Sequence, residues 1–95
     1  MSNPVFGDAV IRDPVGLHAR PAIKMTKLAK RFDAAVSIAA GSEGPWVNAA
    51  SLVKVMGLKV RAGAALYFRG EGTDAEAAVA AMVDLVTRDF PDQPA

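Results

Sequence analysis

The only histidine of the chain, His18, lies in the segment Gly-Leu-His-Ala-Arg-Pro-Ala at residues 16–22, where a loop is expected to become a helix. The start of a helix leaves backbone N–H groups without partners and carries a partial positive charge, so it favours an anion. Arg20 adds a planar guanidinium group that suits phosphate oxygens, and Pro21 is tolerated in a first helical turn. The segment therefore predicts a nucleophilic His18 whose phosphoryl group is held by Arg20 and by the backbone N–H groups of Ala19 and Arg20.

A lone histidine at a helix start is more often a cap or an exposed residue, so the neighbouring residues must decide. At ~100° per residue, the helix expected over residues 19–32 has an apolar face made of Pro21, Ala22, Met25, Leu28, Ala29 and Phe32. The opposite face carries a basic stripe made of Arg20, Lys24, Lys27 and Arg31, and the apolar Ile23 lies beside it. An apolar residue within a basic stripe next to a reactive histidine indicates a docking surface for an acidic partner.

Ser51 is a second candidate site, because it precedes a short helix expected over residues 52–56. Serine is a preferred N-cap, so a purely structural role is the alternative to regulation by phosphorylation. A phosphate on Ser51 would lie at a helix start, where its charge is tolerated. The predicted partner-binding surface, called the docking surface below, combines both helices and consists of Ile23, Lys24, Lys27, Leu52, Val53 and Lys54.

The elements that must position these residues follow from hydrophobic periodicity. Period-two alternation predicts a strand over residues 5–12, with Val5, Gly7, Ala9 and Ile11 facing inward, and further strands over residues 34–40, 46–48 and 64–69. A turn at residues 41–45 joins the second strand to the third. The last helix is expected to start at a capping box, Thr73-Asp74-Ala75-Glu76, and to bury an apolar face that ends at Phe90.

This order, strand-helix-strand-strand-helix-strand-helix, predicts an α+β fold. In so short a chain, three helices and four strands can bury their apolar surfaces only if all three helices lie on one face of a four-stranded antiparallel sheet. The other face of the sheet is then open to water. We expect one domain over residues 1–90 and a short tail over residues 91–95.

Composition narrows the class of protein. A hydrophobic content of 52% excludes global disorder, and a net charge of +1 argues against a general nucleic-acid binder. The absence of cysteine excludes disulfides, thiolate zinc sites and thiol catalysis. No apolar run approaches the ~20 residues that a membrane span needs, and the segment Met-Ser-Asn-Pro at residues 1–4 lacks a signal-peptide pattern. We therefore expect a cytoplasmic protein that uses no metal or cofactor and binds neither nucleic acid nor membrane.

The segments at residues 16–22 and 47–52, the latter reading Val-Asn-Ala-Ala-Ser-Leu, resemble HPr, the histidine-containing phosphocarrier of the phosphoenolpyruvate-dependent phosphotransferase system. The resemblance covers roughly residues 5–88 and implies the open-faced β-sandwich of that family, with the element order βαββαβα. It also implies that His18 accepts a phosphoryl group from enzyme I on Nδ1 and passes it to an enzyme IIA domain, while Arg20 helps to hold the group. Ser51 lies where the family has a regulatory serine, the target of an HPr serine kinase/phosphorylase in some lineages.

The sequence departs from the family pattern in several places. The serine motif reads Ala-Ser-Leu-Val-Lys instead of the common Lys-Ser-Ile-Met-Gly, Lys59 replaces a common glycine, and Trp46 has no role beyond core or edge packing. No carboxylate stands out as a partner of His18, and Asp13 is interpreted as a loop residue. We expect a monomer. Two alternatives to a sugar-system carrier remain, a nitrogen-related regulatory module and an anion-binding domain without a covalent step.

Overall fold

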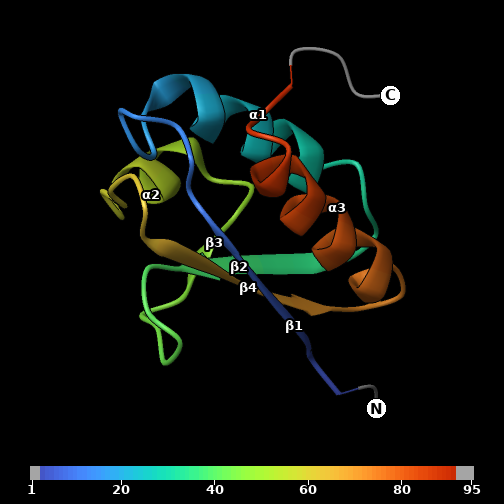
Figure 1. Cartoon of the computed structure of the whole chain (residues 1–95). Helices are drawn as coiled ribbons and strands as arrows, with labels where there is room; N and C mark the ends of the chain where they lie inside the picture. Colours follow the sequence, from blue (N-terminus) through green and yellow to red (C-terminus); the bar gives the residue numbers. More distant parts are fainter. Residues whose placement is uncertain (1–2, 92–95) are drawn as a thin grey trace.

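The computed structural model describes residues 3–91 and confirms the predicted α+β fold. Its elements are β1 (Val5–Val10), α1 (Ala19–Ala29), β2 (Ala35–Ala39), β3 (Val47–Asn48), α2 (Leu52–Met56), β4 (Ala65–Glu71) and α3 (Ala75–Thr87). The strands form one antiparallel sheet in the order β1-β4-β2-β3 (Figure 1). Most of the tail expected after residue 90 lies outside the described residues.

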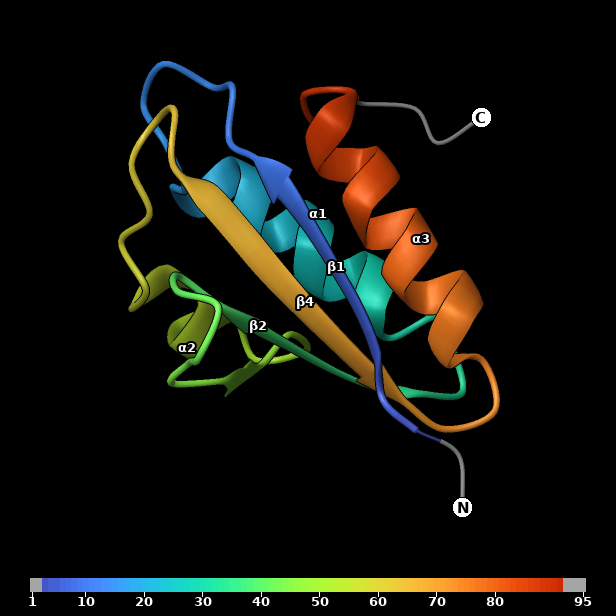
Figure 2. The ribbon, with the colours of Figure 1, turned by 60° about the horizontal axis from the view of Figure 1, so that its bottom comes forward.

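The helices cover one face of the sheet, and α1 and α3 lie side by side on it (Figures 1 and 2). The strand β4 shows how the sequence produces this arrangement. Leu66 and Phe68 are fully buried under the helices, whereas Tyr67 and Arg69 alternate with them and are half-buried on the other face. The predicted two-residue periodicity is therefore confirmed in the strand at the centre of the sheet.

Two glycines let α3 approach the sheet closely. A Cβ atom at Gly7 in β1 would lie 2.8 Å from Val79 Cγ1, and one at Gly70 in β4 would lie 2.8 Å from Val79 Cγ2 and 3.1 Å from the Ala75 carbonyl. Both distances to the valine are shorter than real side-chain contacts. The backbone of the two strands thus takes the place of side chains beneath α3.

Several predicted boundaries were wrong by a few residues. The first strand ends at Val10 instead of residue 12, and β4 continues to Glu71. The helix α1 ends at Ala29 instead of residue 32, because the chain then turns so that the Asp33 N–H reaches the Asp74 carboxylate, 2.8 Å away.

That contact also overturns the predicted capping box. Asp74, not Thr73, occupies the N-cap position of α3, and its side chain makes no cap hydrogen bond. Its carboxylate accepts instead from the Asp33 N–H, while the Asp74 N–H donates to the Asp33 carbonyl at 3.0 Å. This reciprocal pair ties the start of α3 to the segment that follows α1.

The open face of the sheet carries Trp46, which lies outside the buried core. Its ring centroid is 6.2 Å from that of Phe6, and the Arg69 guanidinium carbon lies 4.7 Å from the Trp46 ring centroid. Phe6 and Arg69 are directly opposite each other in the β1–β4 pairing, so Trp46 packs across two strands. Among residues 3–91, no helix is long and apolar enough to cross a bilayer.

Candidate functional site

The loop between β1 and α1 is fixed by backbone hydrogen bonds before it reaches His18. The Gly16 N–H donates to the Asp13 carbonyl at 2.8 Å, which closes a tight turn, and the Leu17 N–H donates to the Val60 carbonyl at 2.8 Å. Gly16 has a φ of +85°, and a Cβ atom there would lie 2.6 Å from the Val60 oxygen. Only glycine fits this position, so the motif needs Gly16 to deliver the following histidine to the helix start.

His18 occupies the N-cap position of α1 with extended backbone angles, φ −114° and ψ −169°. Its carbonyl accepts from the Ala22 N–H at 3.0 Å, but its side chain makes no cap hydrogen bond. The imidazole, 35% exposed, is therefore available for chemistry instead of capping the helix. The first turn of α1 contains no acidic residue that would compete with an anion on the ring.

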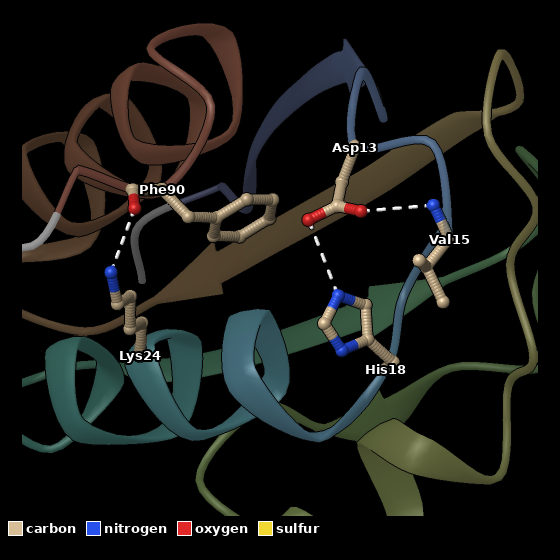
Figure 3. Close-up of polar contacts among 5 residues, drawn as sticks. All are labelled: Asp13, Val15, His18, Lys24 and Phe90. Atoms are coloured by element: carbon tan, nitrogen blue, oxygen red, sulfur yellow. Dashed lines mark hydrogen bonds and ion pairs between the residues drawn. The ribbon is translucent and has the colours of Figure 1, made fainter.

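Asp13 is the site residue that the sequence interpretation missed. Its Oδ2 lies 3.2 Å from His18 Nε2, and its Oδ1 accepts from the Val15 N–H at 2.9 Å (Figure 3). The pKa of Asp13 is lowered below its ordinary value by the Val15 N–H and by the hydrogen bond to His18, with smaller effects of the His18 and Arg20 charges. The signal that could have revealed it is the turn formed by residues 13–16, which folds the carboxylate back over the histidine.

The predicted faces of α1 are confirmed, with one addition. Ile23 is 39% exposed, and Arg20 and Lys27 are exposed, whereas the predicted apolar residues are buried or half-buried. Thr26 is also buried, because its hydroxyl donates to the Ile23 carbonyl at 3.0 Å and so needs no water.

Lys24 contacts the segment that follows α3. Its Nζ donates to the Phe90 carbonyl at 2.8 Å, and Figure 3 shows its side chain directed to the chain after α3. The accepting segment is unusual, since Asp89 and Phe90 have φ values of +59° and +52°, and Phe90 is buried. The contact fastens the end of α3 to α1, so the charge of Lys24 is partly engaged within the fold.

The helix α2 begins and ends where the sequence predicts. Ser51 is its N-cap and its hydroxyl accepts from the Lys54 N–H at 3.5 Å, which confirms the structural role of the serine. Leu52 and Val53 are 36% and 82% exposed, and Lys54 is exposed. Because α1 and α2 contact each other, the two halves of the docking surface belong to neighbouring helices.

Two further exposed apolar residues adjoin these elements. Val15, in the loop before His18, is 73% exposed, and Met56, at the end of α2, is 39% exposed. Neither residue is part of the docking surface predicted from the sequence. Lys59, in the loop after α2, has a φ of +52° and thus adopts the left-handed conformation that favours the glycine common at this position in the family it resembles.

Comparison with known proteins gives a consistent result. Residues 7–88 match the family model PTS-HPr, described as the PTS HPr component phosphorylation site. The chain is 43% identical over 72 residues to the phosphocarrier protein HPr of Haloferax volcanii, covering 76% of this chain and 81% of that protein. It is 38% identical over 80 residues to the phosphocarrier protein NPr of Shewanella violacea, covering 84% and 86%. The crystal structure of HPr from Bacillus anthracis superimposes with a TM-score of 0.79 at 33% identity, covering 90% and 99%.

Proposed function

The chain belongs to the HPr family of phosphocarriers of the phosphotransferase system, and from that premise we propose that His18 is the residue that carries the phosphoryl group. The observation that supports this assignment most directly is the position of the His18 ring. It stands at the N-cap of α1 without capping the helix, and among residues 3–91 only Nε2 of its ring is hydrogen-bonded.

The physical chemistry of the site suits a carrier. Phosphoryl transfer depends mainly on positioning and on stabilising charge on the transferring group. The N–H groups at the start of α1 and the exposed Arg20 can supply that stabilisation. In such a protein the histidine is itself the substrate, and partner proteins bring the remaining machinery.

The experiment is phosphorylation by phosphoenolpyruvate and purified enzyme I, followed by intact-protein mass spectrometry. We expect one added phosphoryl group that is lost in acid and kept in base, and we expect none on His18→Ala. A His18→Ala protein that is labelled as well as the wild type would exclude His18. The anion-binding alternative predicts that His18→Gln still binds phosphate. It also predicts that neither the wild type nor His18→Gln acquires a covalent adduct.

We further propose that enzyme I and enzyme IIA domains use the docking surface in turn. Its exposed apolar residues, Ile23, Leu52 and Val53, are interspersed with the basic Lys27 and Lys54, which suits an acidic partner with an apolar centre. Regulation through Ser51 belongs to the same proposal, because Ser51 lies at the start of α2 beside this surface.

The similarity to NPr of Shewanella violacea favours a second candidate, a regulatory module of the nitrogen-related branch in which the phosphorylation state of His18 is read by partners and no sugar is moved. The two candidate functions are distinguished by the protein that accepts the phosphoryl group from His18. A protein phosphorylated on His18 is mixed with enzyme IIA domains of either branch, and the faster transfer identifies the physiological one.

A further inference from the structure

The contact between Asp13 and His18 uses Nε2 and leaves Nδ1 on the far side of the ring (Figure 3). The lowered pKa of Asp13 means that it is a carboxylate at neutral pH. An ionised carboxylate can only accept a hydrogen bond, so a neutral His18 ring that pairs with it must carry its proton on Nε2. The lone pair of the ring is then on Nδ1.

Asp13 is held in place independently of the histidine. Its Oδ1 accepts from the Val15 N–H at 2.9 Å, and its carbonyl accepts from the Gly16 N–H at 2.8 Å. Its side chain is 15% exposed, less than half the exposure of the His18 side chain. A carboxylate fixed in this way orients the ring instead of following it.

We propose that Asp13 is a positioning residue for phosphoryl transfer: it holds neutral His18 with the proton on Nε2, makes Nδ1 the nucleophile, and stabilises the charge that the ring acquires. This inference rests on the proposed role of His18. It adds a residue five positions earlier to the machinery of that site.

The positive charge on the ring follows from the movement of electron pairs during phosphoryl transfer. The Nδ1 lone pair forms a bond to phosphorus while the bond from phosphorus to the donor atom breaks, and its electron pair leaves with the donor. No proton leaves the ring, so the ring carries a positive charge shared with Nε2–H. The Asp13 carboxylate, 3.2 Å from Nε2, lies where that charge develops. In onward transfer an acceptor atom of the next protein forms a bond to phosphorus while the bond from phosphorus to Nδ1 breaks. The electron pair of that bond stays on Nδ1, and the ring becomes neutral imidazole again.

The test compares Asp13→Asn with the wild type, because asparagine has a single oxygen. If that oxygen accepts from the Val15 N–H, the NH₂ group faces the ring and no longer favours a proton on Nε2. The exposed Asp8 in β1 supplies the matched control, Asp8→Asn. The first measurement, ¹⁵N NMR of the neutral His18 ring, needs no partner protein. We expect the Nε2–H tautomer in the wild type and in Asp8→Asn, and a tautomer mixture in Asp13→Asn.

The second measurement is the rate of phosphorylation by enzyme I. We expect Asp13→Asn to be roughly tenfold slower or more, as for loss of a charge-assisted hydrogen bond, although it is still folded at the assay temperature, and we expect Asp8→Asn to be unaffected. Asp13→Glu should recover part of the rate. A tautomer and a rate that are both unchanged in Asp13→Asn would overturn the proposal and leave Asp13 as a loop anchor. If the tautomer shifts but His18→Ala is still labelled, the role of His18 as carrier fails while the ring-orienting contact stands.

Discussion

At the scale of single residues, Asp13 links the site to the pH dependence of stability. Its pKa is lowered in the folded protein, chiefly by the Val15 N–H and then by His18, against opposing burial. A lowered folded-state pKa contributes stability that is fully present above the unfolded-state value of about 3.9 and is lost as the pH falls through the folded-state value.

We therefore expect the free energy of unfolding of the wild type to exceed that of Asp13→Asn near neutral pH, and the difference to shrink below about pH 3.9. Urea unfolding of both proteins at a series of pH values measures it. A difference that persists unchanged into strong acid would contradict a native carboxylate at Asp13.

Ser51 can be tested as both a cap and a switch. The hydrogen bond from the Lys54 N–H is long at 3.5 Å, so Ser51→Ala should lose about 0.5–1 kcal/mol of stability and transfer phosphate normally. Ser51→Asp keeps a good N-cap but adds negative charge beside the docking surface, so it should fold normally and accept phosphate from enzyme I more slowly. Equal transfer rates for the two variants would show that Ser51 serves only as a cap.

At the scale of elements, the docking surface combines one face of α1 with the exposed residues of α2. Ile23→Asp and Lys27→Glu should slow phosphoryl transfer with little change in melting temperature, because both side chains are exposed. The effect of Lys27→Glu should diminish with added salt, since the Debye length is ~10 Å at 0.1 M.

Arg31→Glu is the matched control for Lys27→Glu, because it makes the same charge change at an exposed position beyond the end of α1. Transfer that responds equally to both charge reversals would point to the net charge of the protein instead of a defined surface.

The contact of Lys24 with Phe90 predicts a different behaviour for its neighbour on the same helix. Lys24→Met should lower the free energy of unfolding by about 1–2 kcal/mol, because the Phe90 carbonyl loses a charged donor at 2.8 Å. Lys27→Met, on the exposed face, should change it by less than about 0.5 kcal/mol. Urea unfolding of the two variants measures this difference. Equal free energies of unfolding would mean that the contact between Lys24 and the Phe90 carbonyl contributes nothing measurable to stability.

At the scale of the whole molecule, the close approach of α3 to the sheet can be measured through its glycines. Gly70→Ala would place a methyl group 2.8 Å from Val79 Cγ2, so it should cost about 1–3 kcal/mol by overpacking. Gly41→Ala is the control, because its new methyl group would meet its nearest neighbour at an ordinary 3.5 Å. Thermal unfolding should show a lower midpoint for Gly70→Ala alone, and equal midpoints would mean that α3 shifts at no cost.

The sequence predicted those parts of the molecule that depend on local pattern. Element order, the period-two alternation of β4, and the cap at Ser51 follow from periodicity and from short-range preferences, and all are confirmed. The contacts of Asp74 with Asp33 and of Lys24 with Phe90 join residues 41 and 66 positions apart, so no local pattern shows them.

The candidate site divides in the same way. The helix start at residue 18 was predicted from the local motif, because a cap position depends on its immediate neighbours. The role of Asp13 was missed because it depends on the three-dimensional path of the turn, which brings a carboxylate five residues away within 3.2 Å of Nε2. Residue types and spacing alone do not specify that path.

Trp46 is the only tryptophan of the chain, so the intrinsic fluorescence of the protein originates on the open face of the sheet. Its emission depends on β1 and β4 holding Phe6 and Arg69 against the indole, and it should change when the sheet comes apart. The docking surface lies on helices that cover the opposite face. An emission signal therefore monitors the integrity of the fold without interference from a tryptophan-free partner bound at α1 and α2.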